Sequence, residues 1–346
     1  MRAKRILYLL LREAGIGLAL VIMVIAFSAA APRFASMANV TNILTQISIN
    51  TVISVGMTFV ILLGGIDLSV GSVLALATIV GGMIITNESL SPGTAMLLSV
   101  LGSFLTGCLC GVFNGVVCER WKIHSFIVTL GMLNIARGAA LQISGSRTIS
   151  EFPDAFNDVG AAAIAGVPVI FLIALAVVLA GRFILARTVF GRMIYAIGNN
   201  EEAVRLSGHD PSLYKVAAFI LCGGMVGVAA IIYMMRLNIA SPILGVGFEL
   251  NAIAAVVIGG TSMSGGKGSM IGTLLGASIM GVLNNGLLLL GMGDFARQMV
   301  TGLIIVVAVI IDKYRALAFI RSSYQLAPAP PREESHAAEP GPGPRG

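Results

Sequence analysis

Residues 94–117 read TAMLLSVLGSFLTGCLCGVFNGVV, a run of 24 residues without a charged side chain. An α-helix needs about 20 apolar residues to cross a hydrocarbon layer about 30 Å thick, so this run predicts a membrane span. Similar runs recur along the chain, of which 57% is hydrophobic and 11% charged. Soluble domains average roughly 45–50% and 25%. The composition therefore excludes a soluble globular protein and predicts an all-α, polytopic membrane protein.

We expect ten spans, and the eighth is short enough to be broken or re-entrant. They lie at 15–31, 46–66, 69–86, 94–117, 125–144, 163–185, 216–235, 250–263, 269–290 and 299–311. The first run has an alternative interpretation as a cleaved signal peptide, because basic residues precede it and residues 28–31 read SAAA. Nine further runs favour a first membrane helix.

The basic residues predict the orientation of the chain, since loops that stay in the cytoplasm are enriched in Lys and Arg. With the N-terminus inside, 17 of the 22 basic residues fall on the inner side and four on the outer side. We therefore expect both termini in the cytoplasm. The predicted organisation is a cytoplasmic N-terminus at 1–14, a transmembrane domain at 15–315 and a cytoplasmic tail at 316–346. The Pro- and Gly-rich sequence predicts disorder of this tail from about residue 325.

Glycines recur at intervals of four residues in three places. This spacing puts them on one face of a helix and lets neighbouring backbones approach closely. They are Gly107, Gly111 and Gly115, then Gly223 and Gly227, then Gly268, Gly272 and Gly276. The pattern predicts tight helix packing, and smooth faces that slide during transport are the alternative.

Two glycine-rich turns share a pattern, with GGIDLSVGS at 64–72 and GGTSMSGGKGS at 259–269. Both read Gly-Gly, three residues, Ser and then a Gly-Ser pair, which indicates a weak internal repeat. Their shared or distinctive positions are Gly64, Gly65, Asp67, Ser69, Gly71, Gly259, Gly260, Ser264, Gly266 and Lys267. The second turn lacks the first glycine of a phosphate-binding loop and the Ser or Thr after its lysine. The chain therefore shows no nucleotide-hydrolysing site of its own.

Polar amides lie within or beside the predicted spans, where each is costly unless it is partnered or faces water. One interpretation is hydrogen bonding between helices. The other is a passage for a neutral polyol, because amides donate and accept without binding an ion. The candidate path residues are Asn50, Asn114, Asn134, Asn251, Asn284 and Asn285. Asp67 and Asp312 are expected at inner ends and Glu249 at an outer edge, which argues against a proton-driven transporter.

The longest inner loop, 181–215, contains a predicted short helix. Asn199 or Asn200 can cap it, acidic residues in its first turn favour the positive end of its dipole, and Ser207-Gly208 ends it. Such a helix is either an amphipathic connector or a docking element for a cytoplasmic partner.

Several motifs in order resemble a known family. The turn at 64–72, the segment GNNEEAVRLSG at 198–208 and the run ELNAIAAVVIGGTS at 249–262 are similar to signatures of the ribose-type permeases of bacterial ABC importers. Residues 267–268 and GVLNNG at 281–286 extend this similarity, which covers residues 39–315. The branched-chain amino acid permeases are related. Glu202 and His209 depart from the pattern, where a small and an aliphatic residue are common.

The resemblance implies a subunit of the bacterial inner membrane that forms a homodimer, pairs with ABC ATPase subunits and receives a monosaccharide from a periplasmic sugar-binding protein. ATP and Mg would bind to the ATPase, leaving this chain without cofactor, metal, nucleic-acid partner or covalent chemistry. The ATPase-coupling loop would contain Gly198, Asn199, Asn200, Glu201, Ala203, Arg205, Ser207 and Gly208.

The outer segment 145–162 is expected to form part of the surface that docks the binding protein, through Arg147, Glu151, Asp154 and Asp158. Three alternatives remain at this point: a permease for another small solute such as a branched-chain amino acid, a secondary transporter that needs no partner, and a membrane enzyme. The enzyme is disfavoured because the three histidines lie at span edges or in the tail without an evident acid partner.

Overall fold

The computed structural model describes residues 2–325, and the side chains of residues 13–314. Contacts divide the chain into Met1–Asp312 and Lys313–Gly346. The first unit contains the helices discussed below. Of the second unit, the described residues 313–325 are helical. The tail predicted to be disordered lies outside the described residues.

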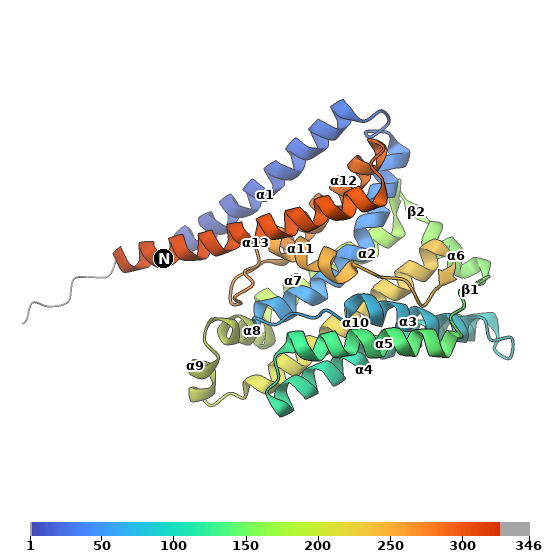
Figure 1. Cartoon of the computed structure of the whole chain (residues 1–346), viewed down its shortest axis with the longest axis horizontal. Coiled ribbons are helices and arrows are strands. Elements are labelled where there is room, and N and C mark those ends of the chain that lie inside the picture. Colours follow the sequence, from blue (N-terminus) through green and yellow to red (C-terminus); the bar gives the residue numbers. More distant parts are fainter. Residues whose placement is uncertain (1, 326–346) are drawn as a thin grey trace, which may run out of the picture. The chain divides into compact units, whose positions relative to one another are not determined.

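The described chain is mostly helical (Figure 1). Its helices are α1 (Arg2–Ala30), α2 (Met37–Leu62), α3 (Val70–Ile85), α4 (Pro92–Trp121), α5 (Ser125–Ser144), α6 (Asp154–Ala161), α7 (Val169–Arg187), α8 (Val189–Asn199), α9 (Glu201–Leu206), α10 (Pro211–Leu237), α11 (Phe248–Ile258), α12 (Met270–Leu289) and α13 (Asp294–Gln325). Four two-residue strands are β1 (Ile149–Ser150), β2 (Ala163–Ile164), β3 (Val167–Pro168) and β4 (Ile239–Ala240). Antiparallel pairs form between β1 and β4 and between β2 and β3.

Eight of the described helices are long and apolar enough to cross a membrane, and α3 and α11 are shorter apolar helices. Together they account for the ten predicted runs, and the all-α membrane fold is confirmed. The eighth run is short, as expected, with 11 residues in α11. The third run is also short, with 16 residues in α3, because the chain after α2 stays irregular as far as Ser69. The first helix begins at Arg2, and its apolar span, Glu13–Ala30, agrees with the predicted run at 15–31.

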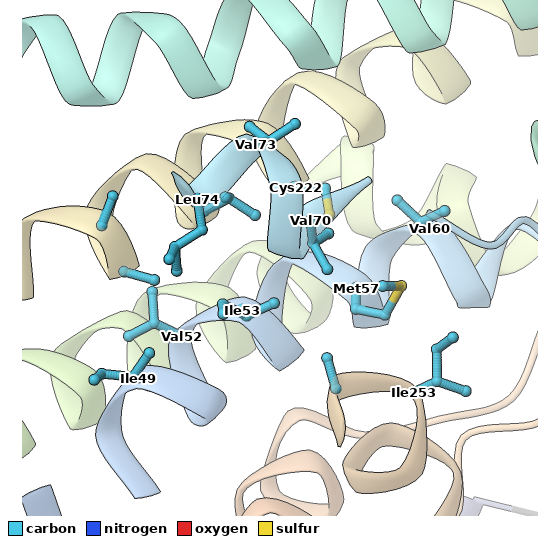
Figure 2. Close-up of a cluster of buried hydrophobic side chains, with 14 of the residues drawn as sticks. Ile49, Val52, Ile53, Met57, Val60, Val70, Val73, Leu74, Cys222 and Ile253 are labelled. Carbon is cyan, nitrogen blue, oxygen red and sulfur yellow. The ribbon is translucent and has the colours of Figure 1, made fainter. Parts of the chain in front are cut away.

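The core surrounds α2, whose second half is buried on every side. Figure 2 shows Ile53 and Met57 of α2 beside Leu74 of α3, Cys222 of α10 and Ile253 of α11. All five side chains are at most 6% exposed. A helix buried on all its faces belongs in the interior of a bundle, and α2 is in contact with α7, α10, α11 and α12.

Glycines bring α4 and α10 into backbone contact. A Cβ atom added to Gly107 would lie 2.1 Å from the carbonyl oxygen of Gly223, and one added to Gly223 would lie 2.1 Å from the carbonyl oxygen of Gly107. Gly111 faces the Phe219 carbonyl in the same way, at 2.3 Å. The predicted tight packing is confirmed, and the two separate glycine patterns belong to one interface.

The third glycine pattern joins α11 to α12. A Cβ atom on Gly272 would lie 2.1 Å from the Gly259 carbonyl oxygen, and one on Gly276 would lie 1.9 Å from that of Ala255. The short α11 is therefore held closely along the first turns of α12. Ser269 fixes the start of α12 by accepting a hydrogen bond from the backbone N–H of Gly272.

The α4–α10 contact yields a stability prediction. We expect Gly107→Ala to destabilise the protein by about 1–3 kcal/mol, the usual cost of overpacking, because the added methyl meets backbone that cannot rotate away. Thermal unfolding is measured in detergent, and size-exclusion chromatography is the readout of the folded fraction. Gly17→Ala is the matched control, since none of the described residues lies within 4 Å of a Cβ atom at that helical position. Equal stability of the two variants would contradict the proposed role of the glycine contact.

Candidate functional site

The short helix α9 has the ends that the sequence predicts. Asn200, rather than Asn199, is its N-cap, and its side chain accepts a hydrogen bond from the backbone N–H of Ala203 at 3.0 Å. Ser207 ends the helix, and Gly208 follows with a φ of +86°, a conformation that glycine adopts without strain. Asp210 then caps α10, and hydrogen bonds from the backbone N–H and the hydroxyl of Ser212 hold the pKa of this exposed carboxyl below its ordinary value.

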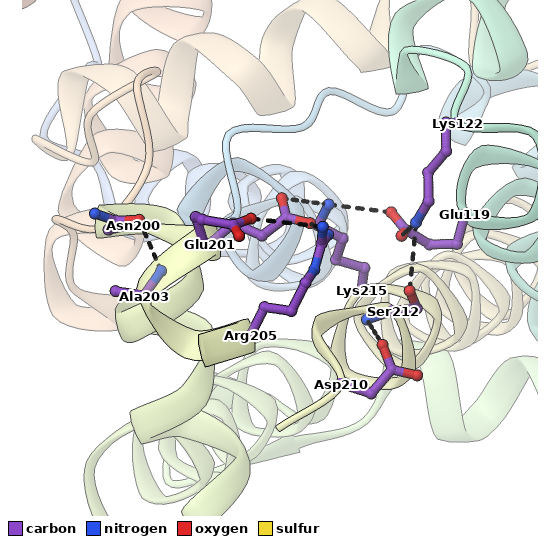
Figure 3. Close-up of polar contacts among 10 residues, drawn as sticks. Glu119, Lys122, Asn200, Glu201, Ala203, Arg205, Asp210, Ser212 and Lys215 are labelled. Atoms are coloured by element: carbon purple, nitrogen blue, oxygen red, sulfur yellow. Dashed lines mark hydrogen bonds and ion pairs between the residues drawn. The ribbon is translucent and has the colours of Figure 1, made fainter. Parts of the chain in front are cut away.

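An ion-pair network connects α9 to the ends of α4 and α10 (Figure 3). Lys215 Nζ lies 2.7 Å from Glu201 Oε2 and 3.2 Å from Glu119 Oε1. Lys122 pairs with Glu119 at 2.9 Å, and Arg205 with Glu201 at 3.2 Å. Lys215 is only 20% exposed, whereas Lys122 and Arg205 are more than half exposed. The less exposed Lys215 is therefore the main electrostatic connection between α9 and the membrane helices, since exposed pairs contribute little.

The residues before α9 are anchored on both glycine-rich turns. A Cβ atom on Gly198 would lie 1.9 Å from the Leu62 carbonyl oxygen and 2.5 Å from the nitrogen of Gly266. That Gly266 N–H donates to the Leu62 carbonyl at 2.8 Å. Asn199 donates to the Gly266 carbonyl at 3.2 Å, and Tyr195 donates to that of Gly268 at 2.9 Å. A Cβ atom on Gly265 would lie 3.0 Å from the nitrogen of Gly64 and 3.0 Å from the carbonyl oxygen of Gly198, so the two turns that share a sequence pattern meet at the segment that carries α9.

The remaining turn residues lie around this contact or have other roles. The backbones of Gly64, Gly65, Gly259 and Gly260 follow the ends of α2 and α11. Ser264 donates its N–H to Ser262. Asp67, expected at the inner end of a span, is 2% exposed. It accepts hydrogen bonds from the N–H and hydroxyl of Ser69 at 2.9 and 2.6 Å, because the chain turns back into the bundle before α3 begins.

A second feature is a cavity of about 320 Å³ between α2, α10, α11 and α12. We call it the amide cavity, because its polar lining consists of Gln46, Asn50, Asn251 and Asn284 together with Tyr233 and Arg236. Its volume is at the lower end of the range of about 300–1,000 Å³ that small-molecule sites occupy. It lies toward the ends of α2, α10 and α12 that are remote from α9.

The cavity lining suits a neutral ligand with hydroxyl groups. Asn50 Oδ1 is buried and has no hydrogen-bond partner among the described residues, so it can accept from a ligand. The rings of Tyr233 and Phe248, 6.4 Å apart, supply an apolar wall. Arg236 is the one charged group of the lining. Amides beside an aromatic wall match a sugar ring, which has polar edges and apolar faces.

The other predicted path residues lie elsewhere. Asn114 is buried and donates to Ser69 Oγ at 3.0 Å. Asn134 is exposed on α5 and donates to the carbonyl of Leu130. Asn285 and Asn39 exchange amide hydrogen bonds of 3.0 and 2.9 Å. The structure therefore brings together Asn50, Asn251 and Asn284, and it gives Asn285 a role in packing.

The four charged residues predicted to dock a soluble partner lie within one short segment of the chain. Arg147, Glu151, Asp154 and Asp158 are all exposed, around β1 and α6. Phe152 and Phe156 anchor this segment with edge-to-face rings 6.1 Å apart, and the Phe152 N–H donates to Asn238 Oδ1. Helix α9 is bonded to Lys215 near the start of α10, whereas Phe152 is bonded to Asn238 at the end of α10. The two surfaces therefore face opposite sides of the bundle.

Sequence reasoning missed several residues of both sites. Tyr233 and Arg236 lie one turn apart on α10, and two polar side chains at this spacing could have indicated a polar face of the helix from the sequence. Phe248 carried none, because its place follows from the chain reversal before α11. Lys215 and Glu119 are 96 positions apart in the sequence, and only the packing of α4 on α10 joins them.

Comparisons with known proteins give the family of the chain. Residues 39–309 match a family model described as the permease component of the branched-chain amino acid transport system. The ribose import permease protein of Escherichia coli K12 is 40% identical over 299 residues, which cover 85% of this chain and 92% of that protein. That of Bacillus subtilis is 39% identical, with 88% and 94% covered. The D-allose transport permease of Escherichia coli K12 is 37% identical, with 85% and 89% covered. No solved structure gives a significant match to the chain.

Proposed function

The chain belongs to the family of permease components named for the branched-chain amino acid transport system, and we propose that it carries a monosaccharide across a bacterial inner membrane. Its sequence relatives include ribose and D-allose permeases, which supports a sugar as the solute. It would be the membrane-spanning subunit of a binding-protein-dependent ABC importer. The observation that carries the choice of solute is the amide cavity with its aromatic wall.

A branched-chain amino acid fits this cavity less well. Such a solute presents an ammonium and a carboxylate, and both need charged or strongly polar partners when they leave water. The lining offers Arg236 for a carboxylate but no Asp or Glu for an ammonium. A monosaccharide needs only donors and acceptors such as the three asparagines. The cavity therefore favours the sugar.

The ATP-hydrolysing partner would dock on α9. The outward side of this helix exposes Glu202, Ala203, Arg205 and Leu206, and Leu206 is 81% exposed. An exposed leucine within a charged rim is the usual composition of a docking surface. ATP and its metal would bind to that partner, whose closure supplies the energy.

Movement of α9 can reach the amide cavity along α10. Lys215, near the start of α10, bonds to Glu201 of α9, and Tyr233 of the same helix lines the cavity. Eighteen residues separate them, which is about 27 Å of helix. The glycine contacts with α4 along this length hold the two helices together. A tilt imposed at Lys215 would therefore move the cavity wall, which suits alternating access by rigid bodies.

The amides of the cavity provide the main test of the proposed function. We expect Asn50→Ala and Asn251→Ala each to lower sugar uptake about fivefold to thirtyfold, because a lost hydrogen bond inside a site costs about 1–2 kcal/mol. Uptake is measured in vesicles that contain the ATPase and the loaded binding protein. Asn87→Ala, in the exposed loop after α3, is the control. Full uptake by both cavity variants would remove the cavity from the path, and uptake without ATP or ATPase would indicate a secondary transporter.

The exposed leucine of α9 tests the docking surface. Leu206→Asp should abolish co-purification of the ATPase subunit and ATP-driven uptake, because a carboxylate in an apolar contact remains unpaired. Leu206→Met, which keeps the apolar volume, should retain both. Normal complex formation by the aspartate variant would show that the ATPase docks elsewhere.

Charge reversal tests the surface around α6, which would receive a periplasmic sugar-binding protein. Replacing Glu151, Asp154 and Asp158 together by Lys should raise the binding-protein concentration needed for half-maximal uptake at least tenfold at low salt, and less at high salt. Glu88→Lys, exposed in the loop between α3 and α4, is the control for a changed surface charge. An unchanged concentration dependence in the triple variant would argue against docking at α6.

A further inference from the structure

The hydroxyl groups of α2 fall into two sets. Four of them donate a hydrogen bond to the carbonyl oxygen four residues earlier, which is a common arrangement for Ser and Thr in a helix. These four are Thr41, Thr45, Ser48 and Thr58. Thr51 and Ser54 are 0% exposed, and their hydroxyl oxygens have no hydrogen-bond partner among the described residues. Buried polar groups without a partner are costly to the folded state, so a role in binding a solute would account for these two.

Both unpartnered hydroxyl groups lie on the face of α2 that contacts α12. One end of this contact is at Gly281, where an added Cβ atom would lie 2.3 Å from Cγ1 of Ile47. The other end is at Thr273, whose hydroxyl oxygen is 2.8 Å from that of Thr58. The two unpartnered groups lie between these ends, four and seven residues after Ile47, and therefore on the same side of the helix. We call this contact, between residues 47–58 of α2 and residues 273–281 of α12, the α2–α12 seam.

The α2–α12 seam begins at the amide cavity. Ile47, Asn50, Ala277 and Gly281 all line that cavity. Thr58, at the other end of the seam, is eight residues beyond Asn50, which is about 12 Å of helix. This direction leads to the end of α2 whose last carbonyl groups lie beside the segment before α9. The seam therefore connects the cavity with the side of the bundle on which the ATPase would dock.

The chemistry of the seam suits a solute that carries hydroxyl groups. Such a solute needs new hydrogen-bond partners when it leaves the amides of the cavity, because unpaired polar groups are costly away from water. The hydroxyl groups of Thr51 and Ser54 can each donate and accept. The small side chain of Ala277 lies on the facing side of α12, four residues from both Gly281 and Thr273. In this structure the seam is closed, since Thr51, Ser54 and Thr58 are all 0% exposed.

We propose that the α2–α12 seam is the inner half of the solute path. Thr51 and Ser54 would bind the hydroxyl groups of the solute after it leaves the amide cavity, and the contact between Thr58 and Thr273 would close the inner end. The proposal rests on the proposed function and adds the route by which the sugar reaches the cytoplasm. Separation of α12 from α2 would open this route, and the hydroxyl groups of the sugar would then satisfy those of the seam.

Cysteine labelling tests whether the seam opens to water. Ser54→Cys is compared with Ser48→Cys, because Ser48 is equally buried on α2 but is turned about 100° from Ile47 and away from the seam. A small charged methanethiosulfonate reacts with a thiol that meets water, because the thiolate is the reactive form. In vesicles that contain the ATPase and the loaded binding protein, we expect Ser54→Cys to react at least fivefold faster than Ser48→Cys during ATP hydrolysis. The unchanged chain controls for its own cysteines at 108, 110, 118 and 222, and a smaller ratio would overturn the proposal.

Substitution of Thr51 tests whether the hydroxyl group itself is used. Thr51→Val keeps the branched shape and removes the hydroxyl group, whereas Thr51→Ser keeps the hydroxyl group. We expect Thr51→Val to lower the amount of sugar imported per ATP hydrolysed at least fivefold, and Thr51→Ser to retain it. A defect of folding or docking would instead lower ATP hydrolysis and uptake together. An unchanged ratio in Thr51→Val would overturn the proposal.

The two levels of inference fail in different ways. Uptake of sugar by the unchanged chain is measured in the same vesicles and reports the proposed function directly. If the α2–α12 seam is not the path, that uptake remains and only the expected differences between the variants disappear. If the proposed function is wrong, the unchanged chain itself imports no sugar.

Discussion

The backbone contact between α4 and α10 is the interaction on which the rest of the structure depends. Gly107 and Gly223 each face the other's carbonyl oxygen, and no larger residue fits there. In a membrane, where helices gain little from the hydrophobic effect, close packing of this kind supplies much of the association energy. The contact also makes one stiff unit of the two longest internal helices. Lys215 at one end and Tyr233 toward the other are thereby held at a fixed separation.

A second constraint is that backbone N–H and C=O groups need hydrogen-bond partners wherever the chain is not helical inside the membrane. Both α3 and α11 start within the bundle, so the segments before them carry polar groups at depth. Before α3, Asp67 and Ser69 satisfy their polar groups by hydrogen bonding to each other and to Asn114. Before α11, Arg137 satisfies two carbonyl groups. Short helices whose ends lie within the membrane are a common way to build solute sites in transporters, and the amide cavity does include the start of α11.

Properties that depend on local spacing were predictable from the sequence, and those that depend on chain reversal were not. Glycines four residues apart predicted close helix contact, although not that two distant patterns face each other. Asn199 and Asn200 both qualified as a cap, and only backbone geometry selects Asn200. Asn284 and Asn285 are equivalent in composition, but one helical step of about 100° puts the first on the cavity and the second against Asn39. Such a rotation needs the neighbouring helices to be known.

The chemistry of the amide cavity also bears on where the importer would discriminate between solutes. Neutral amides bond to a hydroxyl with modest net energy, about 0.5–1.5 kcal/mol each, and three of them with one aromatic wall give weak binding. Weak binding suits a path, because a solute held tightly would not leave. Selection among similar monosaccharides would then belong to the soluble receptor. The cavity would exclude solutes mainly by charge, since it offers no acidic partner for a buried ammonium. The low charge content of the chain would thus be a property of the solute path as well as of its membrane surface.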